Sequence, residues 1–281
     1  MIDHDLIEQT HSRAALALRL TDTCTGAAQP AGKVRVFMPG RGLAGVKTAS
    51  GYYVFSDLPA GIYRVLVQSQ YYFDEEREID TASLAPLDPV VPIDLTPNPG
   101  YPFPEGATLL RGLVVDQMGS VPGAAVAADI FQPGPEATAR VGSPAPEAAD
   151  MSIRLIDIKG ALQVGNRLVI KDANRSRAEF CRIATPLPAH PDQPFHLTKP
   201  LKFKHLPDTP LSRLAASDQV HTRTSAKGEY VIFFRSIKFE RFLTELTCSH
   251  TYYHSERRDV EVAAGTLTSL GLIKLSPQFS R

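Results

Sequence analysis

The chain has 281 residues, which is long enough for two domains that each bury a core of their own. Its 30 Lys and Arg residues balance its 30 Asp and Glu residues, so no overall field draws it to nucleic acid or to an anionic membrane. With 23 prolines, 19 glycines and no tryptophan, the composition favours short strands joined by turns over long helices. We therefore expect an all-β protein with no nucleic-acid partner.

Residues 1–13 are expected to form an N-terminal leader. Asp3, Asp5 and Glu8 stand where a secretory signal needs positive charge followed by an unbroken apolar core. No apolar run along the chain approaches the roughly 20 residues that a membrane span requires. The sequence therefore predicts cytoplasmic synthesis without a signal peptide, and no membrane span.

A first β-sandwich is expected over residues 14–96. Apolar runs of strand length recur there between turn residues, for example ALALRL, KVRVFM, GYYVF and VVPIDL. In AGIYRVLV, Tyr63, Val65 and Val67 form a uniformly apolar face, and Arg64 lies on the opposite face. This alternation predicts a half-buried strand.

The run MPGRGLAGVKT contains three glycines in the spacing of a dinucleotide-binding fingerprint, Gly40, Gly42 and Gly45. That fingerprint requires a helix after its last glycine, because the helix N-terminus faces the pyrophosphate. The residues that follow, VKTASGYYVF, are β-branched, aromatic and rich in turn formers, and Val46 separates Gly45 from Lys47 where a phosphate loop needs adjacent Gly and Lys. We expect a mobile loop between strands, and no nucleotide or other cofactor.

Stretches dense in proline and glycine predict breaks in the sheets. Residues 97–106, PNPGYPFPEG, are expected to link two domains. Residues 132–150, QPGPEATARVGSPAPEAAD, are predicted to be a flexible or extended connector. A further seam is expected near residues 207–217.

The sequence also contains an internal repeat. GYYVF recurs later as GEYVIFF, YYFDEEREI recurs as YYHSERRDVEV, and TLLRGLVVDQMGSVPGAAVAADI matches ALALRLTDTCTGAAQPAGKVRVFM. We infer that one domain occurs twice, and that the second copy comprises residues 107–131 plus 218–281. The insertion that splits it, residues 132–217, is expected to hold a small β domain at 151–217.

Both copies resemble the carboxypeptidase regulatory-like domain, a transthyretin-like (prealbumin-like) β-sandwich. The residues that carry the resemblance are RGLVVDQMGSVPGAAV in the second copy and TASGYYVFSDLPAGIYRVLV in the first, where Leu58 to Gly61 form a Leu-Pro-x-Gly turn. The second copy lacks that turn at RSIKFERF, which leaves its strand boundaries open. The resemblance implies a domain that stabilises or binds without catalysing a reaction.

The insertion has a pattern of its own. VGNRLVI, EFCRI and the segment PLKFKH, which ends at His205, are similar to a small β-barrel repeat of bacterial surface proteins and phage-derived particles. The alternative, an elaborated loop between two strands, stays open. The expected fold is therefore two transthyretin-like or Ig-like β-sandwiches with an inserted small β-barrel-like domain.

Candidate metal ligands are poorly placed. His250 and His254 lie in a segment that is typical of one strand, where four residues span about 13 Å, too far for one zinc ion. The carboxylates Asp74, Glu75, Glu76 and Asp80 are near one another in the sequence, but a calcium site needs about six to eight oxygens on a turning loop. Arg77 beside them indicates surface ion pairing instead. We expect no metal site.

No motif for nucleophilic catalysis is evident. The chain has no G-x-S-x-G elbow, and its cysteines, Cys24, Cys181 and Cys248, lack metal-type spacing and are expected to be reduced and inert. A Ser-His-Asp triad is defined by geometry that spacing alone does not give. We expect no catalytic residues.

Two groups of residues are candidates for interface or ligand contacts. In KPLKFKHLP, the alternation predicts a strand with Leu201 and Phe203 on one face and the candidates Lys202 and Lys204 on the other, where a solvated face is the simpler interpretation. Aromatic platforms can stack on sugars or anchor a protein interface, although they also fill sandwich cores. The aromatic candidates are Tyr52, Tyr71, Tyr72, Tyr252 and Tyr253.

These observations favour a non-enzymatic structural or adaptor module that contacts a protein assembly through strand edges and loops. The absent signal, the paired sandwiches and the barrel-like insertion suggest a component of a phage-tail-like contractile injection particle that is released by lysis, a hypothesis by analogy. The alternative is a carbohydrate-binding β-sandwich protein whose tyrosines hold a glycan.

Overall fold

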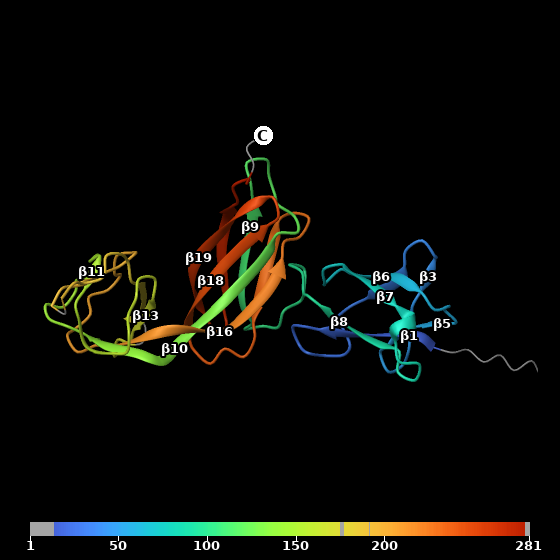
Figure 1. Cartoon of the computed structure of the whole chain (residues 1–281), viewed down its shortest axis with the longest axis horizontal. Coiled ribbons are helices and arrows are strands. Elements are labelled where there is room, and N and C mark those ends of the chain that lie inside the picture. Colours follow the sequence, from blue (N-terminus) through green and yellow to red (C-terminus); the bar gives the residue numbers. More distant parts are fainter. Residues whose placement is uncertain (1–13, 175–176, 191, 279–281) are drawn as a thin grey trace, which may run out of the picture.

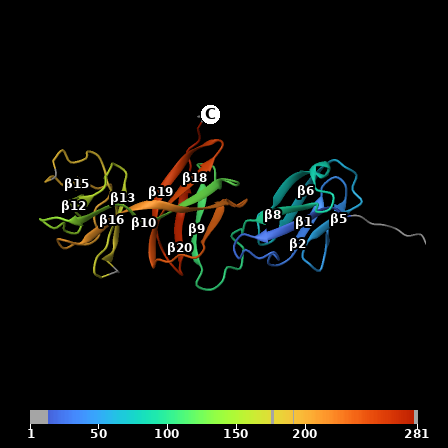
Figure 2. The same cartoon turned by 60° about the horizontal axis from the view of Figure 1, so that its bottom comes forward.

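The computed structural model describes residues 14–174, 177–190 and 192–278. These residues form strands arranged in several sheets, and a short 3-10 helix, η1 (Thr81–Ser83), lies between two of the strands. The prediction of an all-β fold is confirmed. Three units follow one another in a row: an inserted unit, the second sandwich in the middle, and the first sandwich (Figure 1, and from another side Figure 2).

The first sandwich packs two four-stranded sheets face to face. One sheet has the order β4 (Val46–Lys47), β5 (Tyr53–Ser56), β1 (Ala14–Asp22) and β8 (Val90–Leu95). The other has the order β3 (Leu43–Ala44), β2 (Val34–Met38), β6 (Ile62–Ser69) and β7 (Glu75–Asp80). Leu18 and Leu20 from the first sheet meet Val65 and Val67 from the second in one buried cluster. The predicted alternation along β6 is confirmed, because Tyr63, Val65 and Val67 are buried.

The second sandwich repeats this arrangement. Its three-stranded sheet has the order β17 (Glu229–Phe234), β9 (Thr108–Val115) and β20 (Leu267–Lys274), which matches β5, β1 and β8. Its larger sheet contains β16 (Pro210–Arg223), β10 (Ala125–Val141), β18 (Arg241–His250) and β19 (Tyr253–Ala263), which match β3, β2, β6 and β7. In both copies the first and last strands of the sandwich pair in parallel. The topology therefore duplicates as the sequence does.

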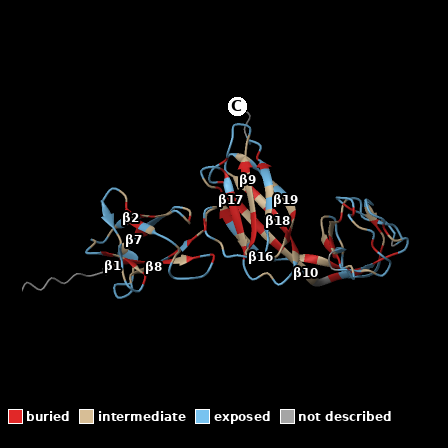
Figure 3. Ribbon diagram, turned by 180° about the vertical axis from the view of Figure 1, so that it is seen from behind, coloured by how far each residue is buried: buried red, intermediate tan, exposed pale blue. Residues whose placement is uncertain are grey.

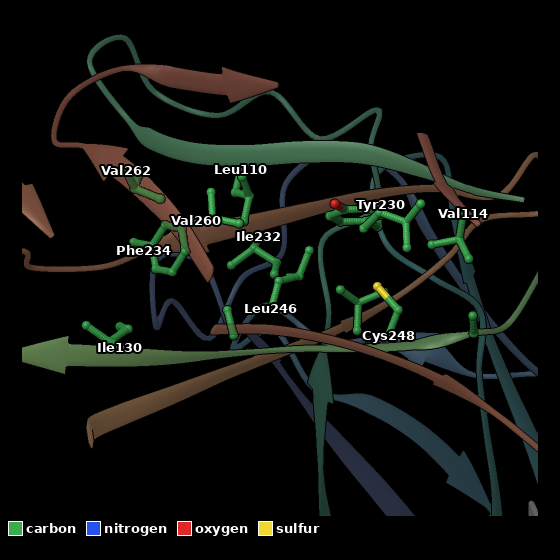
Figure 4. Close-up of a cluster of buried hydrophobic side chains, with 14 of the residues drawn as sticks. Leu110, Val114, Ile130, Tyr230, Ile232, Phe234, Leu246, Cys248, Val260 and Val262 are labelled. Atoms are coloured by element: carbon green, nitrogen blue, oxygen red, sulfur yellow. The ribbon is translucent and has the colours of Figure 1, made fainter. Parts of the chain in front are cut away.

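The core of the second sandwich lies between its sheets. Tyr230 and Ile232 from β17 face Ile130 from β10 and Leu246 from β18, and each of these side chains is almost fully buried (Figure 4). The buried segments of β9, β17 and β18 concentrate in the interior, while loops at the ends of the sandwich are exposed (Figure 3). Burial of this apolar area is the main stabilising term of each sandwich.

The inserted unit occupies residues 142–209, at the end of the β10–β16 ribbon. Its strands are β11 (Ser152–Ile153), β12 (Leu155–Lys159), β13 (Arg167–Ile170), β14 (Glu179–Arg182) and β15 (Phe195–His196). β12 pairs with the end of β10 and β13 pairs with the start of β16, so the large sheet continues from the sandwich into the inserted unit. The described ladders run in open order from β12 to β14, and a closed barrel stays a prediction.

The sequence placed the edges of the insertion wrongly. Residues 132–141 belong to strand β10 and residues 210–217 to strand β16, and the two strands pair as far as Arg140 and Pro210. The prolines in this segment argued against a strand in the sequence, although the alternation ATARV is typical of one. In the structure, Ala137, Ala139 and Val141 are buried. The ladder skips between Pro133 and Thr138, where proline has no N–H to donate.

The glycine-rich run is a turn between strands. Gly40 and Gly42 have φ of 80° and 64°, which glycine adopts without a steric penalty. Strands β3 and β4 follow them, where a dinucleotide fingerprint would need a helix. This turn closes the β2–β3 hairpin, and the matching β10–β16 hairpin of the second copy carries the inserted unit at the same place.

Candidate functional site: the ends and edges of the sandwiches

The end of the first sandwich that faces the second is organised around a buried carboxylate. We call this end the first loop end, comprising residues 23–33, 70–75 and 96–103. Asp22, which is 2% exposed, accepts hydrogen bonds from the Cys24 amide at 2.7 Å and from the Tyr101 hydroxyl at 2.6 Å. Burial is the main cause that raises the pKa of the Tyr101 phenol, and its hydrogen bond to Asp22 is the second cause. Tyr72 accepts from the Ala31 amide at 2.8 Å, so buried side chains fix the loops.

Two arginines of the second sandwich hold the first loop end. Arg235 donates to the backbone oxygens of Thr23 and Cys24. Arg223 donates to the backbone oxygen of Asp74 at 2.6 Å and to a Glu75 carboxylate oxygen at 2.9 Å. The guanidinium of Arg223 also lies 5.1 Å from the centre of the Phe73 ring. Charge-assisted hydrogen bonds of this kind are stronger than neutral ones, and a planar guanidinium is suited to several acceptors.

Aromatic packing completes this contact, which we call the sandwich junction. The Phe103 ring lies 5.8 Å from the Phe233 ring, and Arg111 lies 6.0 Å from the centre of Phe103. Phe103 belongs to the predicted 97–106 linker, and Tyr101 in the same segment is buried in the first sandwich. The segment therefore packs against both sandwiches as well as connecting them.

The first loop end rests on a sheet edge. From Leu214 onward, β16 pairs with β10 alone among the described ladders, and β17 is the outer strand of its own sheet. A groove between the two sandwiches is lined by β16 and β17 on one side, and by Cys24, Pro97 and Phe103 on the other. An uncovered strand edge invites pairing with another chain, so this edge is protected by the first sandwich.

A second contact, the insert junction, joins the inserted unit to strands β18 and β19. Arg167 of β13 forms ion pairs with Glu245 and with Asp259, the latter at 2.9 Å, and lies 4.3 Å from the centre of the Phe131 ring. Arg182 reaches the same Asp259 at 3.7 Å. These side chains surround a small apolar cluster of Val169, Leu214 and Leu243. The inserted unit is thus fixed to the sheet by more than its two chain connections.

A buried histidine between two carboxylates stabilises the inserted unit. His205 has no exposed area, and its ring nitrogens lie 3.2 Å from a Glu179 oxygen and 3.4 Å from an Asp172 oxygen. Glu179 also accepts from the backbone amides of Lys202 at 2.6 Å and Phe203 at 3.3 Å. Burial opposes ionisation of Glu179, but hydrogen bonds from His205 and the two amides outweigh it and lower the pKa of the carboxyl. Lys202, Phe203 and His205 all contact Glu179, which belongs to β14. The cluster therefore holds this segment of the inserted unit against β14.

The lysine candidates lie in this segment. The predicted strand over KPLKFKHLP is wrong: these residues form no regular strand, although Leu201 and His205 are buried and the lysines are exposed. The Lys202 ammonium lies 3.2 Å from Glu261 and that of Lys204 lies 2.5 Å from Glu147. Both cations therefore face carboxylates of the same chain.

The tyrosine candidates fall at separate ends of the two sandwiches. Tyr72 is buried in the core of the first sandwich, which corrects its proposed role as a surface contact. Tyr71 and Tyr52 are half-buried. In the second sandwich, Tyr253 donates to Asp116 at 2.8 Å, whereas Tyr252 is 66% exposed. The structure does not bring these residues together with the lysines into one site.

The histidine candidates differ from the sequence interpretation, whereas the carboxylate candidates do not. His250 ends β18 and His254 belongs to β19, with a hairpin turn between them, so they do not share a strand as expected. Glu75, Glu76 and Asp80 lie in β7 and Asp74 directly precedes it, and the Glu76 carboxylate pairs with Arg64 at 2.5 Å. Within the described residues, no cluster of His, Cys, Asp or Glu has the geometry of a metal site.

Sequence reasoning missed the residues that make the junctions. Arg223, Arg235 and Arg167 look like ordinary surface cations in the sequence, since their acceptors are far away along the chain. The available signal was the aspartate of each copy, Asp22 at the end of β1 and Asp116 directly after β9, because each accepts from a backbone amide two residues on and caps the turn that follows the opening strand.

Comparisons with known proteins give weak structural likenesses. No family model matches the chain, and no curated protein matches its sequence. Among solved structures, the shaft pilin SpaA from Lactobacillus rhamnosus GG shares 10% identity over 96% of this chain and 100% of its own, with a TM-score of 0.24. The major pilin subunit BcpA of Bacillus cereus shares 10% identity over 95% of this chain and 100% of its own, with a TM-score of 0.23. The Streptococcal ancillary pilin shares 10% identity over 94% of this chain and 69% of its own, with a TM-score of 0.23.

TM-scores of this size place the chain in no family. The class that the coordinates themselves define is a multi-unit all-β protein with a duplicated sandwich and two internal junctions. Across the described part of the chain, no helix has the length and hydropathy that a bilayer crossing demands.

Proposed function

We propose that the protein is a non-enzymatic structural module that mediates protein–protein assembly. The observation that carries this proposal is the sandwich junction, in which a protein surface covers the loop end of a sandwich through Arg223 and Arg235. Loops at the end of a rigid sandwich are where such folds place their binding residues. Here those loops contact another β-sandwich, and the hydrogen bond between the buried Asp22 and Tyr101 fixes their shape.

We further propose that each sandwich is a carboxypeptidase regulatory-like domain, and that the assembly is a phage-tail-like contractile injection particle released by lysis. For the first sandwich, the domain assignment is supported by the Leu-Pro-x-Gly turn of Leu58 to Gly61, which lies between β5 and β6, and for the second, which lacks that turn, by its matching strand order. The particle assignment rests on the analogy between the inserted unit and small β repeats of such particles. Mass spectrometry of particles purified from the source tests it, and absence of the chain from them would remove it.

The experiment for the assembly function is affinity isolation of the tagged full chain followed by cross-linking mass spectrometry. We expect one or a few protein partners, with cross-links at exposed strand edges and loops. A glycan array on the same preparation tests the alternative of carbohydrate binding, for which the exposed Tyr252, beside His250 at 5.7 Å between ring centres, is the aromatic platform. Absence of a protein partner, with glycan binding that Tyr252→Ala abolishes, would overturn the assembly function.

A further inference from the structure

The second sandwich has a loop end built like the first. We call residues 116–120, 251–256 and 276–278 the second loop end. The Met118 amide donates to Asp116 Oδ1 at 2.7 Å, as the Cys24 amide donates to Asp22 Oδ1 at 2.7 Å. In each copy a tyrosine hydroxyl then donates to the other oxygen of that aspartate, at 2.8 Å in the second and 2.6 Å in the first.

The backbone contacts of the two loop ends also correspond. Tyr253 bridges to Pro277 as Tyr72 bridges to Pro97. The Gln278 amide donates to the Tyr252 oxygen at 3.0 Å, as the Asn98 amide donates to the Tyr71 oxygen at 3.0 Å. Met118 therefore stands at the position of Cys24, and Tyr252 at the position of Tyr71. By the same alignment, Glu256 stands at the position of Glu75.

The two loop ends differ in what covers them. Cys24 is 5% exposed at the sandwich junction, whereas Met118 is 90% exposed and Tyr252 is 66% exposed. A large apolar and a large aromatic side chain thus lie in water, whereas the residues at the matching positions of the first copy, Cys24 and Tyr71, pack against the core of their own sandwich. Apolar side chains gathered at one end of a domain are typical of an interaction surface.

The first sandwich has an edge, formed by β3 and β4, that corresponds to the edge covered in the second and that pairs with no further strand among the described residues. The Thr48 amide donates to the Tyr52 oxygen at 2.8 Å, as the Ser225 amide donates to the Glu229 oxygen at 2.8 Å, so Val46 stands at the position of Arg223. On this edge, which we call the first-sandwich edge, Val46 is 70% and Leu43 is 41% exposed. Lys47, also exposed, is the last residue of β4.

We propose that the second loop end binds the first-sandwich edge of a second copy of this chain. In this contact Met118 and Tyr252 cover Leu43 and Val46, and the Glu256 carboxylate faces Lys47. The contact follows the arrangement that the sandwich junction makes within one molecule, except that the cation for the loop-end carboxylate, Lys47, stands one residue after the position of Arg223. Since the two surfaces differ, the interface is heterologous, and its repetition builds a head-to-tail chain of copies. This partner assignment rests on the assembly function proposed above.

Sedimentation velocity of the full chain over a concentration series tests the proposal. Wild type should show oligomers that grow with concentration, and Met118→Asp or Val46→Asp should weaken the association at least about tenfold, as loss of a central interface residue does. Leu206→Asp is the matched control, because Leu206 is 66% exposed but lies in the inserted unit. Oligomers that respond to Leu206→Asp as strongly as to Met118→Asp would overturn the proposed contact.

A charge exchange makes the pairing specific. Glu256→Lys and Lys47→Glu should each weaken association, and a mixture of the two variants should restore mixed oligomers. In a second assay, Met118→Cys chains mixed with Val46→Cys chains under an added oxidant should form a disulfide-linked dimer, and Met118→Cys with Leu206→Cys should not. Failure of both the exchange and the cross-link would overturn the contact even if wild type associates.

The proposal and the assembly function fail in different ways. If wild type stays monomeric at high concentration but isolates a different protein partner, the head-to-tail contact is wrong and the assembly function stands. If wild type stays monomeric and isolates no protein partner, both are wrong.

Discussion

The two sandwiches share one strand order and differ at a hairpin and at a loop end. In the first, the β2–β3 hairpin closes in a short turn through Gly40 and Gly42; in the second, the matching hairpin extends and carries residues 142–209. A hairpin tip that points away from the core tolerates an insertion, because no core contact depends on its length. The loop end is different, since an aspartate that is buried in the first copy and partly exposed in the second accepts a hydrogen bond from a tyrosine and fixes the loops in both copies.

The strongest test of the comparison removes equivalent core residues. Leu16 pairs with β5, and Leu110 pairs with the matching strand β17. Both leucines have 0% exposure. We expect Leu16→Ala and Leu110→Ala to cost about 2–5 kcal/mol each through lost burial and cavity formation. Urea unfolding measures both free energies. Leu267→Ala, at a 57% exposed position, should have almost no effect, and a similar loss there would contradict the assigned core.

Equivalent aspartates sharpen the comparison of the loop ends. Asp22 is buried beneath the sandwich junction, so Asp22→Ala leaves donors unpaired and should lower the unfolding free energy by about 1.5–3 kcal/mol. Asp116 makes the matching turn with more solvent around it, and Asp116→Ala should cost less. Thermal unfolding compares the two variants, with Asp22→Asn as the control that keeps an acceptor oxygen. Equal losses of unfolding free energy at both positions would show that the sandwich junction does not increase the stabilisation that Asp22 provides.

A glycine tests how the second copy repacked its core. Leu18 of the first sandwich corresponds to Gly112, and a Cβ at Gly112 would lie 2.5 Å from the Tyr230 hydroxyl. Gly112→Ala should therefore cost about 1–3 kcal/mol by overpacking, and Tyr230→Phe should recover part of it. Gly61→Ala is the control, since a Cβ there would lie 3.9 Å from its nearest neighbour atom, Tyr63 Cε2. Chemical denaturation that finds Gly112→Ala harmless would contradict the close packing of Tyr230.

The smallest expected effect is a pH dependence of the inserted unit. The pKa of Glu179 is lowered in the folded chain, so its ionised form stabilises the fold above the pKa of the unfolded chain. That stabilisation should be lost as pH falls through the unfolded value and then the lower folded one. Glu179→Gln should remove this part of the pH dependence, as measured by denaturant unfolding between pH 7 and about pH 3. An unchanged slope would show that Glu179 is not stabilised as described.

The duplication and the strand periodicity could be predicted from the sequence, because both are patterns of residues that are close to one another along the chain. Tyr63, Val65 and Val67 are buried as their alternation predicts. The ribbon through Pro133 was missed because proline argues locally against a strand, whereas the pairing with β16 is set by residues far along the chain. The arginines of the junctions were missed for the same reason: nothing near Arg223 or Arg167 in the sequence identifies their acceptors.

The most direct test of the account is the distance between the two sandwiches in solution. Spin labels carried by non-natural residues at the exposed positions Arg77 and Lys227 would report it by double electron–electron resonance. With the sandwich junction intact, the account predicts one narrow distance distribution, which broadens when Arg223 and Arg235 are both replaced by serine. A broad distribution in the wild-type chain, unchanged by the two substitutions, would contradict it.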